Sequence, residues 1–489
     1  MPYQVAETEI LRVLRGYNPW WATGTIGADL AKTMRRLAFY ETRTFLRQAG
    51  FNRAVMLSGA RRVGKTTVLY QLAHEALLQK EYAPNEILYV SFDHPILKMS
   101  SPDRILSTFG ENVAPGVKRS LLLLDEIHYA DDWASWLKFW VDTNPYCQIV
   151  ATGSASSALA IDGAESGVGR WATVRVPTLS FYEYLRLMRV ETPALPRGYR
   201  PTRLVSLSKA EAQGILTKCL PLQTHFHRYL LTGGFPEVAL IDNLISAQRL
   251  LREDVVDKVL KRDMTALFNV RNVIELERVF IYLCLHSGQI LIQDTLSKEI
   301  GVARPTVASY LKCLEAANLV NRLDPLDLDG KKSLKPRPKI YLADPSIREA
   351  VLLRGDDALT DSDEMGLIVE TAVVKHLLSF YYRETPRFGY WREPKSGQEV
   401  DFITALPNGA HIAVEVKYSE QPSVKKGEGL YLFAQAHKAT DGLVITKNPA
   451  DYGPLPEAQT PAGAFTPFQI PAFLFLYLLG EIERGAVGG

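Results

Sequence analysis

The stretch Gly59-Ala60-Arg61-Arg62-Val63-Gly64-Lys65-Thr66 lies between the apolar run RAVMLS and the helical run TTVLYQLAHEAL. Glycines suit a phosphate-binding loop because the chain must curl tightly to aim several backbone N–H groups at one point. The lysine then reaches the β and γ phosphates, a hydroxyl ligates Mg²⁺, and the helix N-terminus adds its dipole. We therefore predict a strand, a loop and a helix that bind ATP and Mg²⁺. The predicted nucleotide-binding residues are Gly59, Arg62, Gly64, Lys65, Thr66 and Thr67, with Thr66 also a metal ligand.

Three further motifs complete the predicted nucleotide site. LLLLDEIH delivers Asp125 and Glu126 at the C-terminal end of a buried strand, where ligands bind in such sheets. We expect Asp125 to hold Mg²⁺ through water and Glu126 to polarise the attacking water. In ATGSAS, Ser154 is a candidate sensor of the γ-phosphate together with Thr152, and a plain Gly-Ser turn is the alternative. Arg170 in GVGRW is a candidate arginine finger for an adjacent subunit, with a surface arginine as the alternative.

The surrounding pattern predicts the fold of this part of the chain. The runs RAVMLSG, EILYVSFD, LLLLDE and CQIVATGS have the character of strands and are separated by helical stretches. Strands that alternate with helices indicate a parallel α/β sheet. From about residue 186 to 275 the strand signals fade and helices follow.

Composition restricts the class of protein. A length of 489 residues predicts two to four domains. The net charge of +2 means that any nucleic-acid surface needs local clustering of charge. The four cysteines form no Cys-x-x-Cys pair, which excludes a zinc knuckle and suits a reducing cytosol. The apolar run IPAFLFLYLLG falls short of the roughly 20 residues that span a bilayer. We therefore expect it to be a packed terminal helix in a cytoplasmic protein without a membrane partner.

A set of ordered motifs carries a family resemblance. NPWW, GARRVGKTT, LLLLDEIHYADDW, ATGSAS and LSFYEYL together resemble the bacterial and archaeal AAA+-type ATPases of the AAA_14 class. The later segments GGFPEV and KRDM resemble the domain of unknown function that usually follows in that family. The resemblance implies ATP binding and hydrolysis, and self-association into a ring or other oligomer, with a hexamer expected. GVGRW departs from the family pattern, in which a Gly-Arg is expected inside a more acidic run.

A helix-turn-helix pattern lies in TLSKEIGVARPTVASYLKCLEAANL. The first helix stops at Gly301, and the second begins at Pro305, a favoured first helical position. We expect its apolar residues to form the buried face, and Arg304, Thr306, Ser309, Tyr310 and Lys312 to face a DNA groove.

A basic hairpin is predicted after this helix. It places five cations between Lys331 and Lys339, as a wing against phosphate would need. The predicted DNA-binding residues are Arg304, Thr306, Ser309, Tyr310, Lys331, Lys332, Lys335 and Arg337. The alternative is a winged helix that binds protein and whose charge is merely solvated.

The C-terminal part contains a second set of chemical groups. GLIVETAVVKHLLSFYY is a predicted helix with Glu370, a hairpin strand delivers Asp401, and HIAVEVKYSE places Glu415 and Lys417 on one face of a strand. This order resembles the PD-(D/E)xK, or restriction-endonuclease-like, superfamily. The resemblance implies that Asp401 and Glu415 bind Mg²⁺, that Lys417 orients or activates the attacking water, and that Glu370 completes the metal shell. The alternative is a degenerate nuclease fold kept for binding or packing.

The predicted fold class is α/β: a P-loop NTPase parallel sheet with a helical lid, a winged-helix domain and a C-terminal restriction-endonuclease-like α/β domain. The predicted domains are an N-terminal helical segment 1–48, the AAA+ core 49–185, the lid 186–275, the winged helix 276–350, the nuclease-like domain 360–470, and the terminal helix and tail 471–489. Together they indicate an ATP-driven enzyme that acts on duplex or branched DNA. A regulatory or defence NTPase switch with a non-catalytic C-terminal domain is the alternative.

Overall fold

The computed structural model describes residues 5–48, 50, 52–153, 169–195, 200–268, 270–326, 337–382, 387–406, 411–422, 424–425, 427–437, 439, 441–460 and 463–487. The chain divides into two compact units, Met1–Pro177 with Val487–Gly489, and Thr178–Ala486. The break falls before residue 185, the predicted end of the ATPase core. The helices predicted as a lid of that core, and the terminal helix, belong to the second unit.

The first unit is built on a five-stranded sheet with the order β2-β3-β4-β1-β5, in which every pair is parallel. Its strands are β1 (Ala54–Ser58), β2 (Ile87–Ser91), β3 (Ser120–Asp125), β4 (Cys147–Gly153) and β5 (Trp171–Arg175). The apolar run of β3 is buried at every position. Successive side chains of a strand point to opposite faces, so a fully buried run requires cover on both sides of the sheet.

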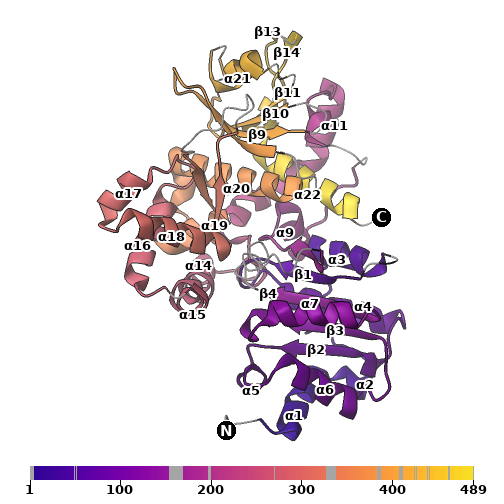
Figure 1. Ribbon diagram of the computed structural model, residues 1–489. Coiled ribbons are helices and arrows are strands. Elements are labelled where there is room, and N and C mark those ends of the chain that lie inside the picture. The colour runs from indigo at the N-terminus through magenta and orange to yellow at the C-terminus, as the bar shows by residue number, and fades with distance from the viewer. Residues whose placement is uncertain are drawn as a thin grey trace. The chain divides into compact units, whose positions relative to one another are not determined.

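Helices supply that cover (Figure 1). They are α1 (Glu7–Tyr17), α2 (Trp20–Thr23), α3 (Leu37–Arg47), α4 (Lys65–Leu78), α5 (Pro95–Lys98), α6 (Pro102–Asn112) and α7 (Trp133–Thr143). Residues of α1, α6 and α7 share one hydrophobic cluster with the strands. Helices α3 and α4 also pack on the strands, but their residues do not belong to that cluster. The parallel α/β sheet expected from the alternating pattern is confirmed.

The NPWW motif lies against β2, the edge strand. The Asn18 side-chain amide donates to Tyr89 O at 2.9 Å and accepts from Tyr89 N at 2.7 Å, as a neighbouring strand would. The indole N–H groups of Trp20 and Trp21 both donate to Ile87 O, at 3.2 and 2.9 Å. These contacts satisfy backbone groups that an edge strand otherwise exposes. The motif is therefore structural in this unit.

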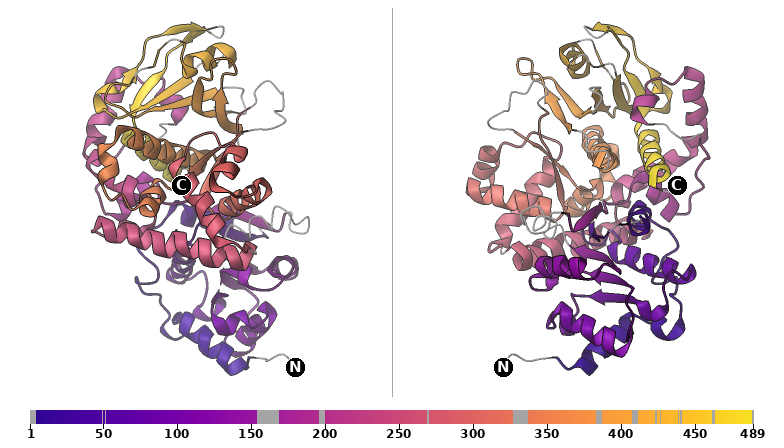
Figure 2. Two further views of the ribbon diagram at one scale, coloured as in Figure 1. Left: turned by 90° about the vertical axis from the view of Figure 1, so that its left-hand side faces the viewer. Right: turned by 45° about the vertical axis from the view of Figure 1, so that its right-hand side comes forward.

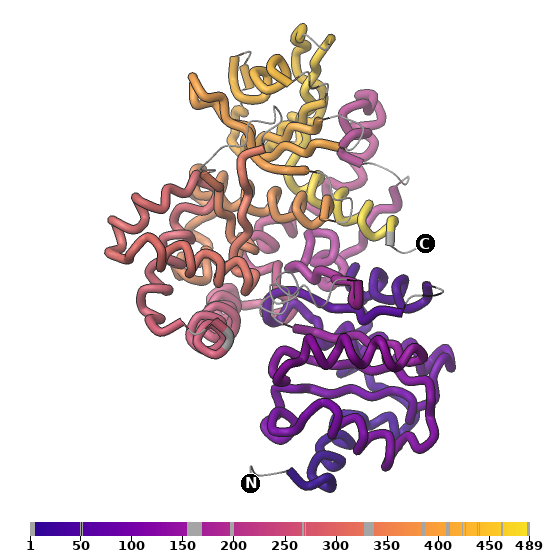
Figure 3. The backbone as a smooth tube through the Cα atoms, in the orientation of Figure 1, coloured from indigo at the N-terminus to yellow at the C-terminus, as the bar shows by residue number. Residues whose placement is uncertain are grey.

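The second unit begins with helices, whose path Figure 3 traces. They are α9 (Phe181–Leu187), α10 (Pro201–Leu204), α11 (Lys209–Cys219), α12 (Phe226–Thr232), α13 (Pro236–Ala239), α14 (Leu244–Leu250), α15 (Met264–Phe268), α16 (Val273–Leu285), α17 (Gln293–Ile300), α18 (Arg304–Ala316), α19 (Pro345–Leu352) and α20 (Ser362–Tyr382). The antiparallel pair β6 (Val320–Leu323) and β7 (Lys339–Leu342) follows α18 and precedes α19. An isolated bridge between Ile290 and Lys339 ties the segment before α17 to β7.

A six-stranded sheet with the order β12-β15-β11-β10-β9-β8 completes this unit. Its strands are β8 (Arg387–Arg392), β9 (Glu399–Ala405), β10 (His411–Lys417), β11 (Asp441–Thr446), β12 (Gly453–Pro454) and β15 (Phe468–Pro471), with a separate pair β13 (Ala458–Thr460) and β14 (Gly463–Phe465). Strands β8, β9 and β10 are antiparallel, whereas β10, β11 and β15 run parallel.

Two layers of helix enclose this sheet (Figure 2). Helices α20 and α22 (Ala472–Val487) share the larger hydrophobic cluster with one face, and α21 (Gly429–His437) packs on the other. The apolar segment of α22 is buried from Phe473 to Leu479, which confirms the expected packed terminal helix. Among the described residues, no helix is both long enough and apolar enough to cross a membrane.

The GGFPEV segment lies over a buried ion pair in the second unit. Lys375 Nζ donates to Asp344 Oδ2 at 2.7 Å, to Tyr229 Oη at 2.9 Å and to Leu179 O at 2.8 Å. A Cβ at Gly234 would lie 1.8 Å from Asp344 Oδ2, so only glycine fits beside this carboxylate. The segment is thus explained by packing.

Candidate functional site

The loop from Gly59 to Thr66 connects β1 to α4 at the C-terminal edge of the first sheet. Gly64 has φ +95°, in the left-handed region that favours glycine. A Cβ on Gly59 would lie 2.2 Å from Val176 O, so this glycine allows close approach of the chain that follows β5. Lys65 Nζ donates to Gly59 O and Ala60 O, both at 3.0 Å, and the buried ammonium thereby lies over the loop.

Asp125 ends β3 and joins the loop to the neighbouring strands. Its Oδ2 accepts from Thr66 Oγ1 and from Tyr89 Oη, each at 2.8 Å, and its Oδ1 accepts from Thr152 Oγ1 at 2.5 Å. Burial and the nearby Glu126 raise the pKa of Asp125, and the hydrogen bonds oppose this shift. The predicted metal ligands Thr66 and Asp125 are thus in direct contact. Thr152, a candidate γ-phosphate sensor, holds the Asp125 carboxylate.

Glu126 follows in an unusual backbone conformation. Its φ of +52° and ψ of +43° place it in the left-handed region, which is rare for a residue with a side chain. Its N–H donates to Thr152 Oγ1 at 2.9 Å, and its Oε2 lies 3.3 Å from His128 Nδ1. The carboxylate remains 27% exposed. It is therefore held at the edge of the site but accessible to water, as a residue that polarises water requires.

The residues present fit ATP with Mg²⁺. The loop supplies backbone N–H groups and a lysine, and a hydroxyl and a carboxylate converge where a hard cation prefers oxygen ligands. Arg36, which lies outside the motifs, donates from Nη1 to Val63 O at 2.7 Å and is buried against the loop. Arg36 and Tyr89 are members of this site that the sequence motifs did not indicate.

The remaining predicted nucleotide contacts are placed differently. Ser154 lies outside the described residues. Arg170 directly precedes β5, and its guanidinium Nε lies 2.7 Å from Asp142 Oδ1. Because β5 is parallel to β1, with Ala54 opposite Trp171, Arg170 is at the opposite edge of the sheet from the loop. It does not contact the nucleotide site of its own chain, and its role towards an adjacent subunit stays a prediction.

A second set of charged groups lies beside the six-stranded sheet, on β7, α20 and strand β9 of that sheet. The ammonium of Lys339, which begins β7, lies 3.1 Å from Glu399 Oε2, 3.2 Å from Asp401 Oδ1 and 3.7 Å from Glu370 Oε1. Its side chain is only 5% exposed. The prediction that Lys339 lies among cations facing phosphate is therefore wrong, because this lysine starts a buried strand beside three carboxylates. We call these four residues the Lys339 cluster.

Neighbouring groups fix the carboxylates of the Lys339 cluster. Tyr341 Oη donates to Glu370 Oε1 at 2.8 Å, and Val416 N donates to Asp401 Oδ2 at 2.9 Å. Burial and the charge of Asp401 raise the pKa of Glu370 to about 8. Glu370 and Asp401, predicted as metal ligands, are thus brought together, but around an ammonium.

Glu415 and Lys417 lie on one face of β10, as predicted. Lys417 Nζ lies 2.8 Å from Glu415 Oε1. Glu415 is 4% exposed, and its Oε2 has no hydrogen-bond partner among the described residues. Burial raises the pKa of Glu415, and the Lys417 charge opposes the shift.

A divalent cation does not fit this arrangement. Within the described part of the chain, no group of three acidic, histidine or cysteine side chains is placed to hold a metal ion. A hard cation needs several carboxylate oxygens around one point, and the point between Glu370 and Asp401 is taken by Lys339. The predicted metal set Glu370, Asp401 and Glu415 is therefore incompatible with Mg²⁺ while this contact is made.

The helix α18 presents only part of its predicted DNA-facing set. Arg304, Ser309 and Lys312 are exposed and Thr306 is half-buried. Arg304 Nη1 lies 3.1 Å from Asp294 Oδ1 of α17. The prediction for Tyr310 is wrong. This residue is three positions after the buried Val307 and so shares its face, and its hydroxyl donates to Asn272 O at 3.2 Å. Lys331, Lys332 and Lys335 lie outside the described residues.

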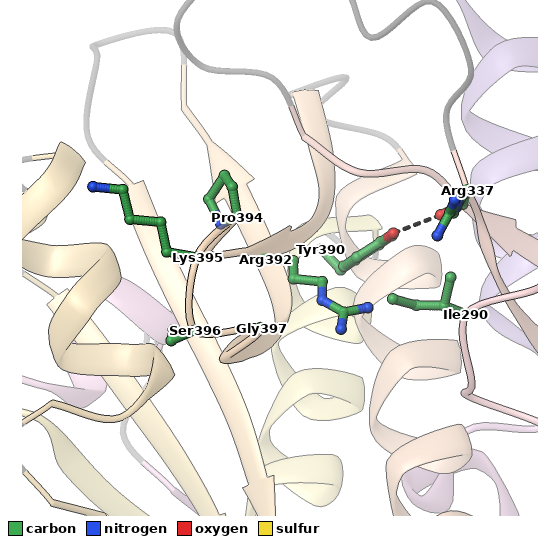
Figure 4. A pocket seen from close by; sticks show the side chains of 8 residues that line it. All are labelled: Ile290, Arg337, Tyr390, Arg392, Pro394, Lys395, Ser396 and Gly397. Atoms are coloured by element: carbon green, nitrogen blue, oxygen red, sulfur yellow. Dashed lines mark hydrogen bonds between the residues drawn. The ribbon is translucent and has the colours of Figure 1, made fainter.

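Arg337 borders a pocket of about 520 Å³ between the base of this hairpin and the turn from β8 to β9 (Figure 4). The pocket is lined by Ile290, Arg337, Tyr390, Arg392, Pro394, Lys395, Ser396 and Gly397. Tyr390 Oη donates to Arg337 O at 2.5 Å, and Arg392 Nη1 lies 3.4 Å from Glu399 Oε1. The pocket thus places arginines from two separate segments beside the Lys339 cluster. Glu399 and Tyr390 carried no sequence signal, because their partners Lys339 and Arg337 are distant along the chain.

His376, expected to be structural, is buried between two backbone groups. It lies 2.7 Å from Ala372 O through Nδ1, and its Nε2 accepts from Phe181 N at 3.0 Å. Burial, with help from the Lys375 charge, lowers the pKa of His376 to about 3. Between pH 6.5 and 3 the unfolded chain binds a proton that the folded chain does not. The free energy of unfolding therefore falls as the pH falls through this window.

Because of His376, we expect the free energy of unfolding to be about 2 kcal/mol lower at pH 5 than at pH 7. Chemical denaturation at both pH values should show that loss in the wild type, and a smaller one in His376→Gln, which cannot titrate. Equal pH dependence in the two proteins would contradict the assignment.

The fold and the first site define the class of the first unit: a P-loop nucleotide-binding domain. Residues 51–185 match the family model described as an AAA domain, AAA_14. Residues 223–358 and 365–458 match two models described as domains of unknown function, DUF8612 and DUF4143. The first unit therefore contains an AAA-type ATPase domain, which confirms that part of the resemblance.

Three comparisons with whole proteins give the extent of the likeness. An uncharacterized protein of Haemophilus influenzae is 26% identical over 304 residues, which cover 60% of this chain and 68% of that protein. An uncharacterized protein of Methanocaldococcus jannaschii is 26% identical over 400 residues, or 80% of each chain. The solved structure of C. elegans PCH-2 aligns with 15% identity and a TM-score of 0.26, over 45% of this chain and 64% of that one, less than two thirds of its length.

Proposed function

We propose that this protein is an ATP-hydrolysing AAA+ machine that acts on duplex or branched DNA. In this proposal a winged helix, formed by α16 to α18 with the hairpin β6–β7, binds DNA. The C-terminal sheet is a restriction-endonuclease-like domain. Assembly into a ring, with Arg170 serving a neighbouring subunit, belongs to the same proposal.

The observation that carries the ATPase part is the contact of Thr66 and Asp125 beside a water-accessible Glu126. A hydroxyl and a carboxylate that meet at the end of the phosphate-binding loop can share one Mg²⁺ ion. A carboxylate next to them, held by Thr152 and His128, can polarise water for attack on the γ-phosphate.

The observation that favours DNA is the distribution of exposed groups on and beside α18. Ser309 and Lys312 are exposed on the helix that follows a helix-turn, and Arg337 lies at the base of the hairpin. Helices in this arrangement read a DNA groove while cations on the hairpin contact phosphate. Arg392 and Lys395 line the pocket next to the hairpin together with Arg337.

The regulatory alternative gains support from Lys339. A domain that binds DNA or protein without cleaving needs no metal ion among its carboxylates. The lysine ammonium found there instead is compatible with such a domain. In that case ATP binding would switch a DNA-binding or protein-binding surface, and no strand would be cut.

DNA binding by the full-length protein tests the proposal. Fluorescence anisotropy with labelled duplex, single-stranded and four-way DNA should show binding at low salt that weakens steeply as salt rises. Lys312→Glu should weaken binding about 10-fold and lower the salt dependence, because one phosphate contact becomes a repulsion. Lys218→Glu, an exposed lysine on α11, is the matched control and should bind as the wild type does. Absence of binding even at low salt would reject the DNA function.

A further inference from the structure

A second pocket lies within the first unit, away from the nucleotide site. Its volume of about 290 Å³ is close to the lower end of the range for small-molecule sites, which is about 300 Å³. Arg119 directly precedes β3 and Gln148 is near the start of β4, so the pocket lies at the edge where the strands begin. The loop from Gly59 to Thr66 follows the end of β1, and all the strands are parallel. The pocket and the nucleotide site are therefore at opposite edges of the sheet.

Part of this pocket is lined by apolar side chains of two helices and a strand. They are Leu46 of α3, Leu72 and Ala76 of α4, and Leu121 of β3. The last three of these are each no more than 4% exposed. Apolar surface of this kind favours the organic part of a ligand over water.

The charged side chains of the pocket are gathered around a buried carboxylate. Glu75 of α4 is 6% exposed. Three guanidinium groups surround it, with shortest N–O distances of 2.9, 3.3 and 3.9 Å, and they belong to Arg35, Arg43 and Arg47. Arg47 also lies 2.7 Å from Glu81 Oε1. The carboxylates thus hold the arginines in place at the ends of α3 and α4.

Arg119 adds a further positive charge from a separate segment. Its guanidinium lies over the ring of Tyr82, 4.3 Å from the ring centroid. The Tyr82 hydroxyl donates to Gln148 Oε1 at 2.9 Å, which fixes the ring under the arginine. Among the residues that line the pocket, together with Arg35, four guanidinium groups meet two carboxylates. Two positive charges of this group are therefore not balanced by a carboxylate of the group.

We propose that this pocket binds a phosphate monoester, with the phosphate at the arginines and the organic part against the apolar side chains of α3, α4 and β3. A phosphate monoester carries about −1.5 to −2 charges at pH 7, which matches the surplus of two guanidinium groups. Guanidinium groups bind phosphate oxygens through paired N–H donors. A carboxylate carries a single charge and would balance only half of the surplus. This site goes beyond ATP hydrolysis and DNA binding and depends on neither.

Calorimetric titration of the full-length protein with phenyl phosphate, inorganic phosphate and benzoate tests the chemistry of the ligand. Phenyl phosphate should bind at least about 10-fold more tightly than inorganic phosphate, because its ring is removed from water. It should also bind at least about 10-fold more tightly than benzoate, which has the same ring and a single charge. Equal affinity for benzoate would overturn the assignment to phosphate, and equal affinity for inorganic phosphate would overturn the role of the apolar side chains.

Variants of the pocket locate the binding. Arg119→Gln should weaken phenyl phosphate binding about 10-fold, because a charged donor is lost from an exposed position. Lys118→Gln is the matched control: it removes an exposed neighbouring charge that does not line the pocket, and should change the affinity by less than about 2-fold. Ala76→Leu should fill the cavity and abolish binding although every charge is kept.

Lys65→Ala separates this pocket from the nucleotide loop, which could also bind a phosphate group. Binding that persists in Lys65→Ala and weakens in Arg119→Gln would support the proposal. Absence of phenyl phosphate binding in the wild type would overturn it, and so would binding that is lost in Lys65→Ala but unchanged in Arg119→Gln. If Ala76→Leu does not fold, Arg119→Gln still decides, because the exposed Arg119 is not part of the buried core.

Discussion

Glu126→Gln is expected to lower the rate of ATP hydrolysis by at least about 100-fold while ATP still binds, since removal of a general base typically costs two to four powers of ten. The substitution keeps the size of the side chain and the hydrogen bond from the Glu126 N–H to Thr152. It removes only the carboxylate that lies at the exposed edge of the site. Phosphate release and binding of a fluorescent ATP analogue would be measured on the same preparations.

The matched control for this prediction is Glu111→Gln, which changes an exposed carboxylate on α6 and should leave both quantities unchanged. An unaltered hydrolysis rate in Glu126→Gln would show that another group polarises the water. Loss of binding together with hydrolysis would show that Glu126 supports the loop and has no separate chemical role.

Asp344→Ala is expected to destabilise the protein by about 3–5 kcal/mol, because it removes the carboxylate that lies 2.7 Å from the buried Lys375 ammonium. The carboxylate also accepts from Ser346 N at 3.0 Å and so caps α19. Asp344→Asn keeps this cap and removes the charge, so its loss should be smaller.

Urea denaturation followed by circular dichroism measures these differences. Asp242→Ala, at an exposed position of the same unit, is the control and should lie within about 0.5 kcal/mol of the wild type. Replacing both partners, as in Asp344→Leu/Lys375→Met, should recover part of the loss, since the desolvated charge is then absent. Equal stability of Asp344→Ala and the control would contradict the importance of the pair.

The grouping of the predicted nucleotide-binding residues was largely predictable from sequence because most of them are local in the chain. The glycines, Lys65 and Thr66 lie in one short stretch of sequence, and Asp125 and Glu126 directly follow an apolar run of strand length. The roles of Arg36 and Tyr89 were not predictable, since each reaches the site from an element with no motif. Thr152 lies beside the predicted site, but its hydroxyl donates to Asp125. This contact depends on β4 lying next to β3, and the sequence does not show the order of the strands.

The second unit shows where local pattern is insufficient. The prediction that Tyr310 faces DNA was wrong. Its spacing from Val307 puts it on the buried face of α18, so the helical period already indicated burial. Lys339 was misplaced for a different reason. It lies in a run of cations, and its partners Glu399 and Asp401 are about sixty positions further along the chain. No periodicity connects such residues, and only tertiary structure brings them together.

Stimulation of ATP hydrolysis by DNA is the most direct test of an ATPase that acts on DNA, because it joins the chemistry of the first unit to the surface of the second. Steady-state phosphate release by the full-length protein would be measured at low salt with and without duplex and four-way DNA. We expect a rate that rises with DNA until saturation, and a Lys312→Glu protein that keeps its basal rate but needs more DNA for the same increase. A rate that stays at its basal value while DNA is shown to bind would contradict coupling between ATP hydrolysis and DNA.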